Sequence, residues 1–199
     1  MDRTIKNETQ VNLAAEAVSP AGLLLRRGAV VVSATLFVAV CAHVSIPLWF
    51  TPVPLTLQPF AVLLLGLLMT PGMAVATMVS YLAEGALGLP VFTPHGLGGL
   101  AQLLGPTGGY LLSYPIVAPL VSVLWRVSSR TFTMAAGIAF AGSFVTLAMG
   151  AAWLGYLTHL TPALLVDHAV LPFLPGDALK VLAAASIATS AGHIRQHRK

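Results

Sequence analysis

A long stretch with almost no charge limits what this chain can fold into. Between Gly28 and Trp125 the only formally charged residue is Glu84. Charged residues make up 8% of all 199 residues and hydrophobic residues 57%, whereas soluble domains carry about 25% charged residues. Because so few charges cannot cover a water-exposed surface, the sequence predicts an integral membrane protein. The net charge is +4, but the basic residues flank apolar runs and form no nucleic-acid-binding patch, so we expect no nucleic-acid partner.

Six apolar segments follow one another, and prolines, glycines or basic residues bound them. A membrane-spanning helix needs about 20 mostly apolar residues. The expected helices cover residues 28–46, 55–70, 73–89, 110–125, 131–157 and 177–194. The fold class is therefore an all-α membrane protein with six transmembrane helices. The expected domains are an N-terminal tail (1–27), a six-helix domain (28–194) and a basic C-terminal tail (195–199).

The basic residues predict how these helices are oriented. With six spans, one side of the membrane receives both termini and these basic residues: Arg26, Arg27, Arg126, Arg130, Arg195, Arg198 and Lys199. The loops of the opposite side contain no Lys or Arg. Since basic loops stay in the cytoplasm, we expect a multi-pass protein of the cytoplasmic membrane, surrounded by lipid, with both termini inside.

Asp177 and Lys180 are the strongest candidates for a binding site. Pro175-Gly176 is expected to form a turn, and the helix that follows places residues three apart on one face. Asp177 could simply cap the helix, and Lys180 could extend to the membrane surface. Two ionisable residues on one face of a very apolar helix favour a ligand site instead. An ammonium suits a carboxylate and an aspartate suits N–H groups, so the ligand is expected to carry an acid and an amide or urea.

Three further features belong to the same expected outer face. Glu84 lies in the outward half of the third segment, either at the water boundary or in the pocket. Gln58 lies at the start of the second, either as a ligand contact or as a hydrogen bond between helices. The glycines of the connection 90–109 indicate tight turns, and such a loop could also form a lid. The expected lid glycines are Gly96, Gly98 and Gly99.

The sequence lacks the usual motifs of phosphate-binding, catalytic and metal-binding sites. The glycine-rich segments are not followed by the G-K-[ST] of a phosphate-binding loop. No GxSxG, HExxH or CxxC motif is present. Only His193 and His197 have the spacing of helical metal ligands, and they lie in the basic tail. We therefore expect no catalytic residue, metal or cofactor, and the alternatives are an intramembrane enzyme using Asp177, Lys180 and Glu84, or a self-sufficient solute facilitator.

Four segments closely resemble the BioY family, the biotin-binding S components of energy-coupling-factor (ECF) transporters. These segments are TPVPLTLQPFAVLLLG (51–66), EGALGLPVF (84–92), LLGPTGGYLL (103–112) and PFLPGDALK (172–180). They occur in the family's order, and the resemblance extends over about residues 28–192.

The resemblance implies a six-helix S-component bundle that captures biotin from the outer side with high affinity. It also implies two kinds of partner for energised uptake, a transmembrane coupling subunit and a pair of ATP-binding-cassette ATPases. The family's ligand-associated Asp and Lys correspond to Asp177 and Lys180, and Gln58, Tyr81 and Tyr110 fall in matching motifs. The family's Ala-xxx-Ala docking pattern has its nearest equivalent in Ala29-xxx-Ser33.

Overall fold

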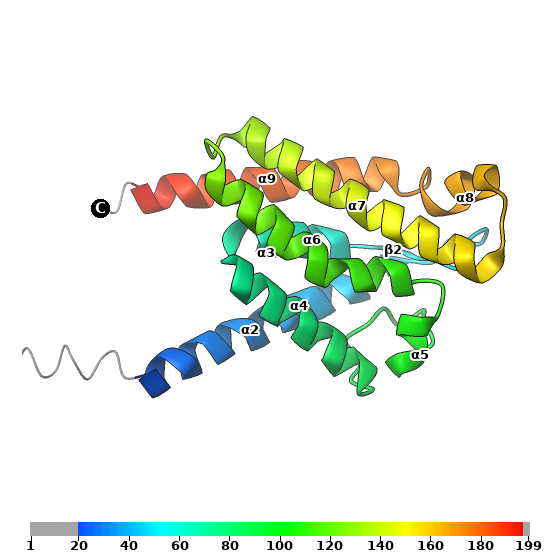
Figure 1. Cartoon of the computed structure of the whole chain (residues 1–199), viewed down its shortest axis with the longest axis horizontal. Helices are drawn as coiled ribbons and strands as arrows, with labels where there is room; N and C mark the ends of the chain where they lie inside the picture. Colours follow the sequence, from blue (N-terminus) through cyan, green and yellow to red (C-terminus); the bar gives the residue numbers. More distant parts are fainter. Residues whose placement is uncertain (1–19, 197–199) are drawn as a thin grey trace, which may run out of the picture.

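The computed structural model of the chain describes residues 20–196, with side chains described up to residue 192, and it is mostly helical (Figure 1). Residues 1–19 of the predicted N-terminal tail and 197–199 of the C-terminal tail lie outside the described residues. The long helices are α2 (Pro20–His43), α3 (Gln58–Leu68), α4 (Pro71–Ala86), α6 (Gly108–Val127), α7 (Phe132–Thr158) and α9 (Leu174–Gln196). Each corresponds to one of the six predicted apolar segments.

The six helices differ in whether they are long and apolar enough to cross a membrane. Within the described residues, α2, α6 and α7 meet that requirement singly. A fourth span results if α8 (Pro162–Ala169) and the following α9 count as one span bent by 51°. Helices α3 and α4 have only 11 and 16 residues, so they are about 16 Å and 24 Å long. The prediction of a helical membrane protein is confirmed, while the number of spans stays a prediction.

Two helix starts differ from their predicted positions. Helix α2 begins at Pro20, eight residues before the expected Gly28, and includes Arg26 and Arg27. Helix α9 begins at Leu174, so Pro175 and Gly176 lie in its first turn, and the prediction of a turn ahead of the helix is wrong. A proline fits there because the first backbone N–H groups of a helix have no partner within the helix.

Helix α6 lies in the middle of the bundle and packs against α3, α4 and α7, while α9 packs against α3 and α7. Helices α6 and α7 approach closely because α7 has glycines at the contact. A Cβ at Gly142 would overlap Val121 and Leu63, and a Cβ at Gly150 would overlap the ring of Tyr110. Small residues permit such approaches in membrane bundles.

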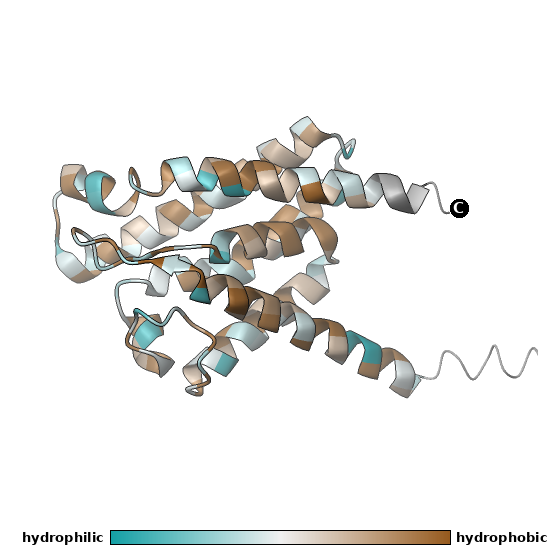
Figure 2. Cartoon of the chain, turned by 180° about the vertical axis from the view of Figure 1, so that it is seen from behind, coloured by the Kyte–Doolittle hydropathy of each residue, from teal (hydrophilic) through white to brown (hydrophobic). Residues whose placement is uncertain are grey.

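The outer faces of the long helices are apolar, as a lipid environment requires. Large side chains with more than half of their surface exposed include Leu36 on α2 and Phe140 and Phe144 on α7. Figure 2 shows brown, hydrophobic residues along the whole length of the long helices. Such extensive apolar exposure is abnormal for a soluble monomer and marks a membrane-facing surface.

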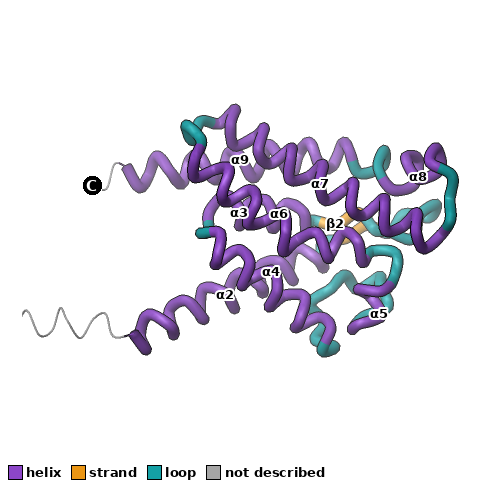
Figure 3. Tube along the Cα trace, viewed as in Figure 1, coloured by secondary structure: helices purple, strands orange, loops and turns teal. Residues whose placement is uncertain are grey.

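The two ends of the bundle have different structures (Figure 3). One end of the bundle holds the start of α2, the end of α9 and the short α3–α4 and α6–α7 connections (Figure 1). At the other end lie the short helices α5 (Gly99–Leu104) and α8, and a hairpin formed by β1 (Ser45–Ile46) and β2 (Leu55–Thr56). The strands are antiparallel, with Ser45 opposite Thr56. This elaborated end carries the candidate site.

Candidate functional site

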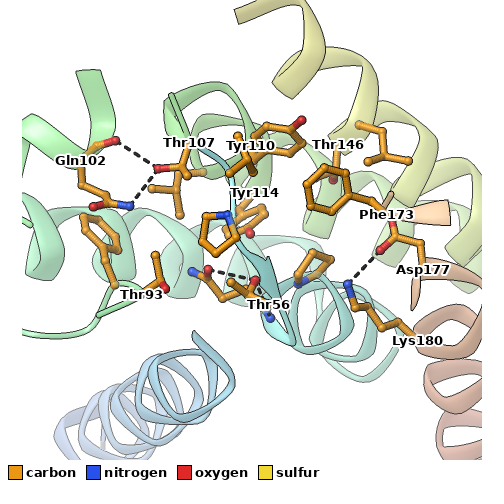
Figure 4. Close-up of a pocket in the computed structure, with 17 residues that line it drawn as sticks. Thr56, Thr93, Gln102, Thr107, Tyr110, Tyr114, Thr146, Phe173, Asp177 and Lys180 are labelled. Atoms are coloured by element: carbon orange, nitrogen blue, oxygen red, sulfur yellow. Dashed lines mark hydrogen bonds and ion pairs between the residues drawn. The ribbon is translucent and has the colours of Figure 1, made fainter. Parts of the chain in front are cut away.

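A pocket lies inside the elaborated end of the bundle, between two hydrophobic core clusters. Its atom-free space, including the part open to solvent, is about 540 Å³. The proline-rich hairpin, the segment before α5, and helices α3, α6, α7 and α9 all contribute to its walls. Most of the lining is apolar, and the aromatic part consists of Phe92, Tyr110, Tyr114 and Phe173 (Figure 4).

The charged pair predicted from the sequence lies on one side of this pocket (Figure 4). Asp177 and Lys180 are 7% and 8% exposed, and Lys180 Nζ lies 2.9 Å from Asp177 Oδ1. The other carboxylate oxygen, Oδ2, accepts a hydrogen bond of 2.7 Å from Ser143 Oγ on α7. Asp177 does not act as the helix cap, because it lies inside the first turn of α9 with its N–H bonded to Phe173 O. Lys180 does not extend to the membrane surface, because its side chain is buried.

The geometry shows how much hydrogen-bonding capacity the two charges keep free. Each oxygen of Asp177 already accepts one hydrogen bond and keeps a further lone pair, and the Lys180 ammonium has three donors and uses one on Asp177. The pair therefore forms one polar end of the pocket, with spare N–H donors for an anionic or carbonyl oxygen. Among the described residues, no group of three or more His, Cys, Asp and Glu could hold a metal ion.

A chain of hydrogen bonds between buried groups connects Gln58 in the pocket lining with the glycine-rich connection. Gln58 lines the pocket, and its Nε2 donates to Tyr81 Oη at 2.6 Å. Tyr81 Oη in turn donates to Val91 O at 2.8 Å. Thr56 Oγ1 donates to Gln58 Oε1 at 3.3 Å. Tyr81 is completely buried and does not line the pocket, so its hydroxyl links the glycine-rich connection to α3 and the hairpin.

Tyr110 lines the pocket with its ring, while its hydroxyl is used elsewhere. Tyr110 Oη donates to Ala169 O at the end of α8, 2.8 Å away, and its ring packs against Phe173 at 6.0 Å between centroids. These contacts place α8 and the start of α9 against α6. The structure thus offers Tyr110 as an apolar wall of the site and not as a free hydrogen-bond donor.

The remaining predicted residues lie outside the pocket. Glu84 on α4 is half-buried and lines neither the pocket nor the hollow beside it. Gly96 lines that neighbouring outer hollow, which lies between the hairpin residues Pro52 and Pro54 and the glycine-rich connection. Gly98 and Gly99 have φ angles of 70° and 57°, the left-handed conformation that glycine adopts most readily.

Gln102 on α5 holds the glycine-rich connection in place and was not predicted from the sequence. Gln102 is 2% exposed; its Oε1 accepts from Gly98 N at 3.1 Å and its Nε2 donates to Thr107 Oγ1 at 2.8 Å. A Cβ at Gly96 would overlap the Gln102 amide. The only sequence signal was a polar residue within an otherwise apolar short segment. Tyr110 was predicted from the BioY resemblance, whereas no distinguishing signal marked Ser143, Thr93, Phe92, Tyr114 and Phe173.

Comparisons with known proteins agree on one family. A model of the BioY family matches residues 9–197. The probable biotin transporter BioY of Pyrococcus horikoshii is 38% identical over 156 residues, covering 77% of this chain and 90% of the relative. The biotin transporter BioY of Thermotoga maritima is 35% identical over 156 residues, covering 77% and 88%. The crystal structure of the S-component for biotin from an ECF-type ABC transporter superposes with a TM-score of 0.79 and 25% identity, covering 88% of this chain and 95% of that one.

Proposed function

This chain belongs to the BioY family, and from that premise we propose that it captures biotin at the outer side of the cytoplasmic membrane for uptake. The relatives are biotin transporters, so the chain is a transport protein rather than an enzyme, as predicted from the sequence. The alternative of an intramembrane enzyme built on Asp177, Lys180 and Glu84 is not favoured.

The observation that carries this proposal is the buried Asp177–Lys180 pair in the wall of a largely apolar pocket. Biotin has a carboxylate, a ureido ring with two N–H groups and an apolar body with a thioether. The spare N–H donors of Lys180 suit the carboxylate, and the aromatic walls suit the apolar body.

The residues predicted from the sequence take different roles in this proposal. Lys180 contacts the ligand directly, with Asp177 beside it. Gln58 and Tyr110 contribute walls, and Tyr81 holds Gln58 through the 2.6 Å hydrogen bond. Glu84 is left at the margin of the site, without a contact in the pocket.

The proline-rich link, residues 51–57 on the β2 side of the hairpin, and the glycine-rich connection act as the lid. Both border the outer hollow, and both contribute walls to the pocket through Pro54 and Thr93. Gln102 lines both spaces and bonds to Gly98. A movement of either segment therefore alters access to the pocket, and the glycines Gly96, Gly98 and Gly99 are suited to that movement.

The chain crosses the membrane six times in this proposal, with both termini in the cytoplasm. The arrangement in Figure 1 supports it, because the start of α2, the α6–α7 turn and the end of α9 share one end of the bundle. Basic residues gather there, and the pocket lies at the other end, which is then outside. Helices α3 and α4 are short because the hairpin and the glycine-rich connection fill the outer part of their crossings. The six-helix domain is the biotin-binding unit.

Energised uptake needs the partners of an ECF module, a transmembrane coupling subunit and two ATPases. The face of α2 that carries Ala29 and Ser33 is exposed, and Ser33 Oγ donates to Ala29 O at 2.8 Å, so these two small residues are open to a partner. The off-register Ala34, Ala39 and Ala42 are buried in the core instead. Small residues let helices of another subunit approach closely.

Uptake of labelled biotin by biotin-auxotrophic cells tests this proposal. Cells that express this chain together with an ECF module should accumulate biotin, and Lys180→Ala should prevent it. The chain expressed alone tests the predicted alternative of a self-sufficient facilitator, which requires equal uptake without the module. Absence of uptake with the module and a membrane-inserted chain would contradict the proposal.

A further inference from the structure

The pocket has two polar sides, and one of them has a free hydroxyl. Asp177 and Lys180 lie on one side, and Thr93 and Gln102 lie on the opposite side, with the aromatic residues between them (Figure 4). Thr93 follows Phe92 in the segment before α5, and its residue is 6% exposed. A ligand that is polar at both ends and apolar in the middle would reach both sides.

Thr93 Oγ1 is buried and has no hydrogen-bond partner among the residues that the structure describes. The other polar groups on this side are already paired. Gln102 bonds to Gly98 N and Thr107 Oγ1, and Gln58 bonds to Tyr81 and Thr56. Buried hydroxyl groups in proteins nearly always have a partner, and an exception that lines a pocket calls for a functional explanation.

We propose that the Thr93 hydroxyl is the second polar anchor of the pocket and binds the ureido ring of the ligand. This inference rests on the proposed function. The N–H donors of Lys180 suit the carboxylate of the ligand, and a ligand bound in this way places its ureido ring on the opposite side of the pocket, where Thr93 lies. A hydroxyl both donates and accepts, and it can therefore bind either the ureido carbonyl or a ureido N–H group.

A second orphan hydroxyl provides a matched control. Ser45 Oγ on β1 is also buried and without a partner within the described residues, but Ser45 does not line the pocket. If both hydroxyls were only packing defects, removing either one would leave ligand affinity unchanged. Removing an unpaired buried hydroxyl does not destabilise the ligand-free protein, so stability should be kept at both positions and ligand affinity should fall only at Thr93.

The experiment measures biotin binding and ligand-free thermal unfolding for wild type, Thr93→Val, Thr93→Ser and Ser45→Ala in detergent. Thr93→Val keeps the shape of the side chain and should weaken biotin binding about 5- to 30-fold, with an unfolding temperature at or above that of wild type. Thr93→Ser keeps the hydroxyl and should therefore retain most of the wild-type affinity for biotin. Ser45→Ala should bind as wild type does.

Biotin amide, which lacks the carboxylate, identifies the end of the ligand that Thr93 contacts. Thr93→Val should weaken the binding of biotin and of biotin amide by the same factor. A penalty that disappears with the amide would place Thr93 at the carboxylate and overturn the inference. Equal affinity of Thr93→Val and wild type for biotin would also overturn it, while the proposed function would stand. A folded wild type that does not bind biotin would instead refute the proposed function, and this inference with it.

Discussion

The Asp177 carboxylate accepts hydrogen bonds from two helices. Ser143 Oγ on α7 and Lys180 Nζ on α9 each donate to a different oxygen, at 2.7 Å and 2.9 Å. Because the pair lies together on one side of the pocket, we expect it to meet only one end of an extended ligand, whereas the sequence also allowed each charge to meet a different end. In the proposed site Asp177 orients Lys180, and Ser143 orients Asp177.

Removing either charge of the pair should weaken biotin binding. Loss of a charged partner in a desolvated site costs roughly 2–5 kcal/mol, or ~30-fold to several-thousand-fold in affinity. We expect at least the lower factor for Lys180→Ala and for Asp177→Asn, measured by titration calorimetry on folded protein. If Lys180 binds the carboxylate, biotin amide should bind wild type poorly and lose little more on Lys180→Ala. Unchanged biotin affinity in both variants would place the site elsewhere.

Ser143→Ala should weaken biotin binding through Asp177. The loss of one hydrogen bond to a buried carboxylate is expected to cost about 1–2 kcal/mol, or roughly 5- to 30-fold in affinity. In an Asp177→Asn background, Ser143→Ala should reduce biotin affinity much less, because the carboxylate to which Ser143 donates is no longer there. Ser122→Ala is the control, since Ser122 Oγ bonds to Met69 O away from the pocket. Equal losses in both backgrounds would show that Ser143 acts independently of Asp177.

Charged residues of the site could be predicted because charge is rare in this chain, whereas neutral polar residues could not. Asp177 and Lys180 stand out in an apolar helix. Thr93 and Ser143 are two of many hydroxyl residues, and only the fold brings them to the pocket or to Asp177. Tyr81 was predicted as a ligand contact, but its hydroxyl is used by Gln58 and Val91.

At the scale of the elements, the two connections at the outer end form one unit with the pocket. The hairpin reaches α8 through the Phe50–His168 ring contact, 6.3 Å between centroids. The glycine-rich connection is held by Gln102 and by Tyr81 through Val91. Each attachment uses one or a few hydrogen bonds or ring contacts, so both segments can open locally at a low cost in free energy.

Biotin should slow hydrogen exchange in both connections. Residues 51–57 and 96–109 are expected to become protected when the ligand fills the pocket beneath them, because closure then removes their backbone groups from water. Exchange measured by mass spectrometry with and without biotin checks this, with the α6–α7 turn at residues 128–131 as the unaffected control. Identical exchange in residues 51–57 and 96–109 under both conditions would contradict a lid.

The positions of the helices could be predicted from the apolar segments, but their ends could not. All six segments became helices, since apolar runs bounded by proline, glycine and charge leave few alternatives. The start of α9 was misplaced because Pro175 can occupy a first helical turn as well as a preceding turn. The short helices α5 and α8 were missed within segments expected to be loops, because six or eight residues carry too little periodicity.

At the scale of the whole molecule, the arginines Arg26, Arg27, Arg126 and Arg130 lie at the end of the bundle opposite to the pocket. Arg126 and Arg130 lie at the α6–α7 turn, and Arg26 and Arg27 lie near the start of α2 at the same end of the bundle (Figure 1). The pocket and both connections occupy the other end. This asymmetry was predictable because the basic residues alternate with the apolar segments along the sequence. The formation of one pocket from six separate segments was not, since it depends on packing.

Cysteine labelling should place the two ends on opposite sides of the membrane. Cys41 is buried, and Cys41→Ala supplies a background without thiols. His95 in the glycine-rich connection and Ser129 in the α6–α7 turn are both exposed. With an impermeant maleimide in intact cells, His95→Cys should react and Ser129→Cys should react only after the membrane is permeabilised. Labelling of Ser129→Cys in intact cells would contradict the proposed orientation.

The central claim is that one chain holds one biotin in the pocket at the outer end of the bundle. Titration calorimetry of the detergent-purified wild type with biotin tests it most directly, with recovery of the ligand afterwards. We expect saturable binding of one biotin per chain, loss of that binding in Lys180→Ala, and chemically unchanged biotin on release. A folded protein that shows no saturable binding, or that returns a converted ligand, would contradict the claim.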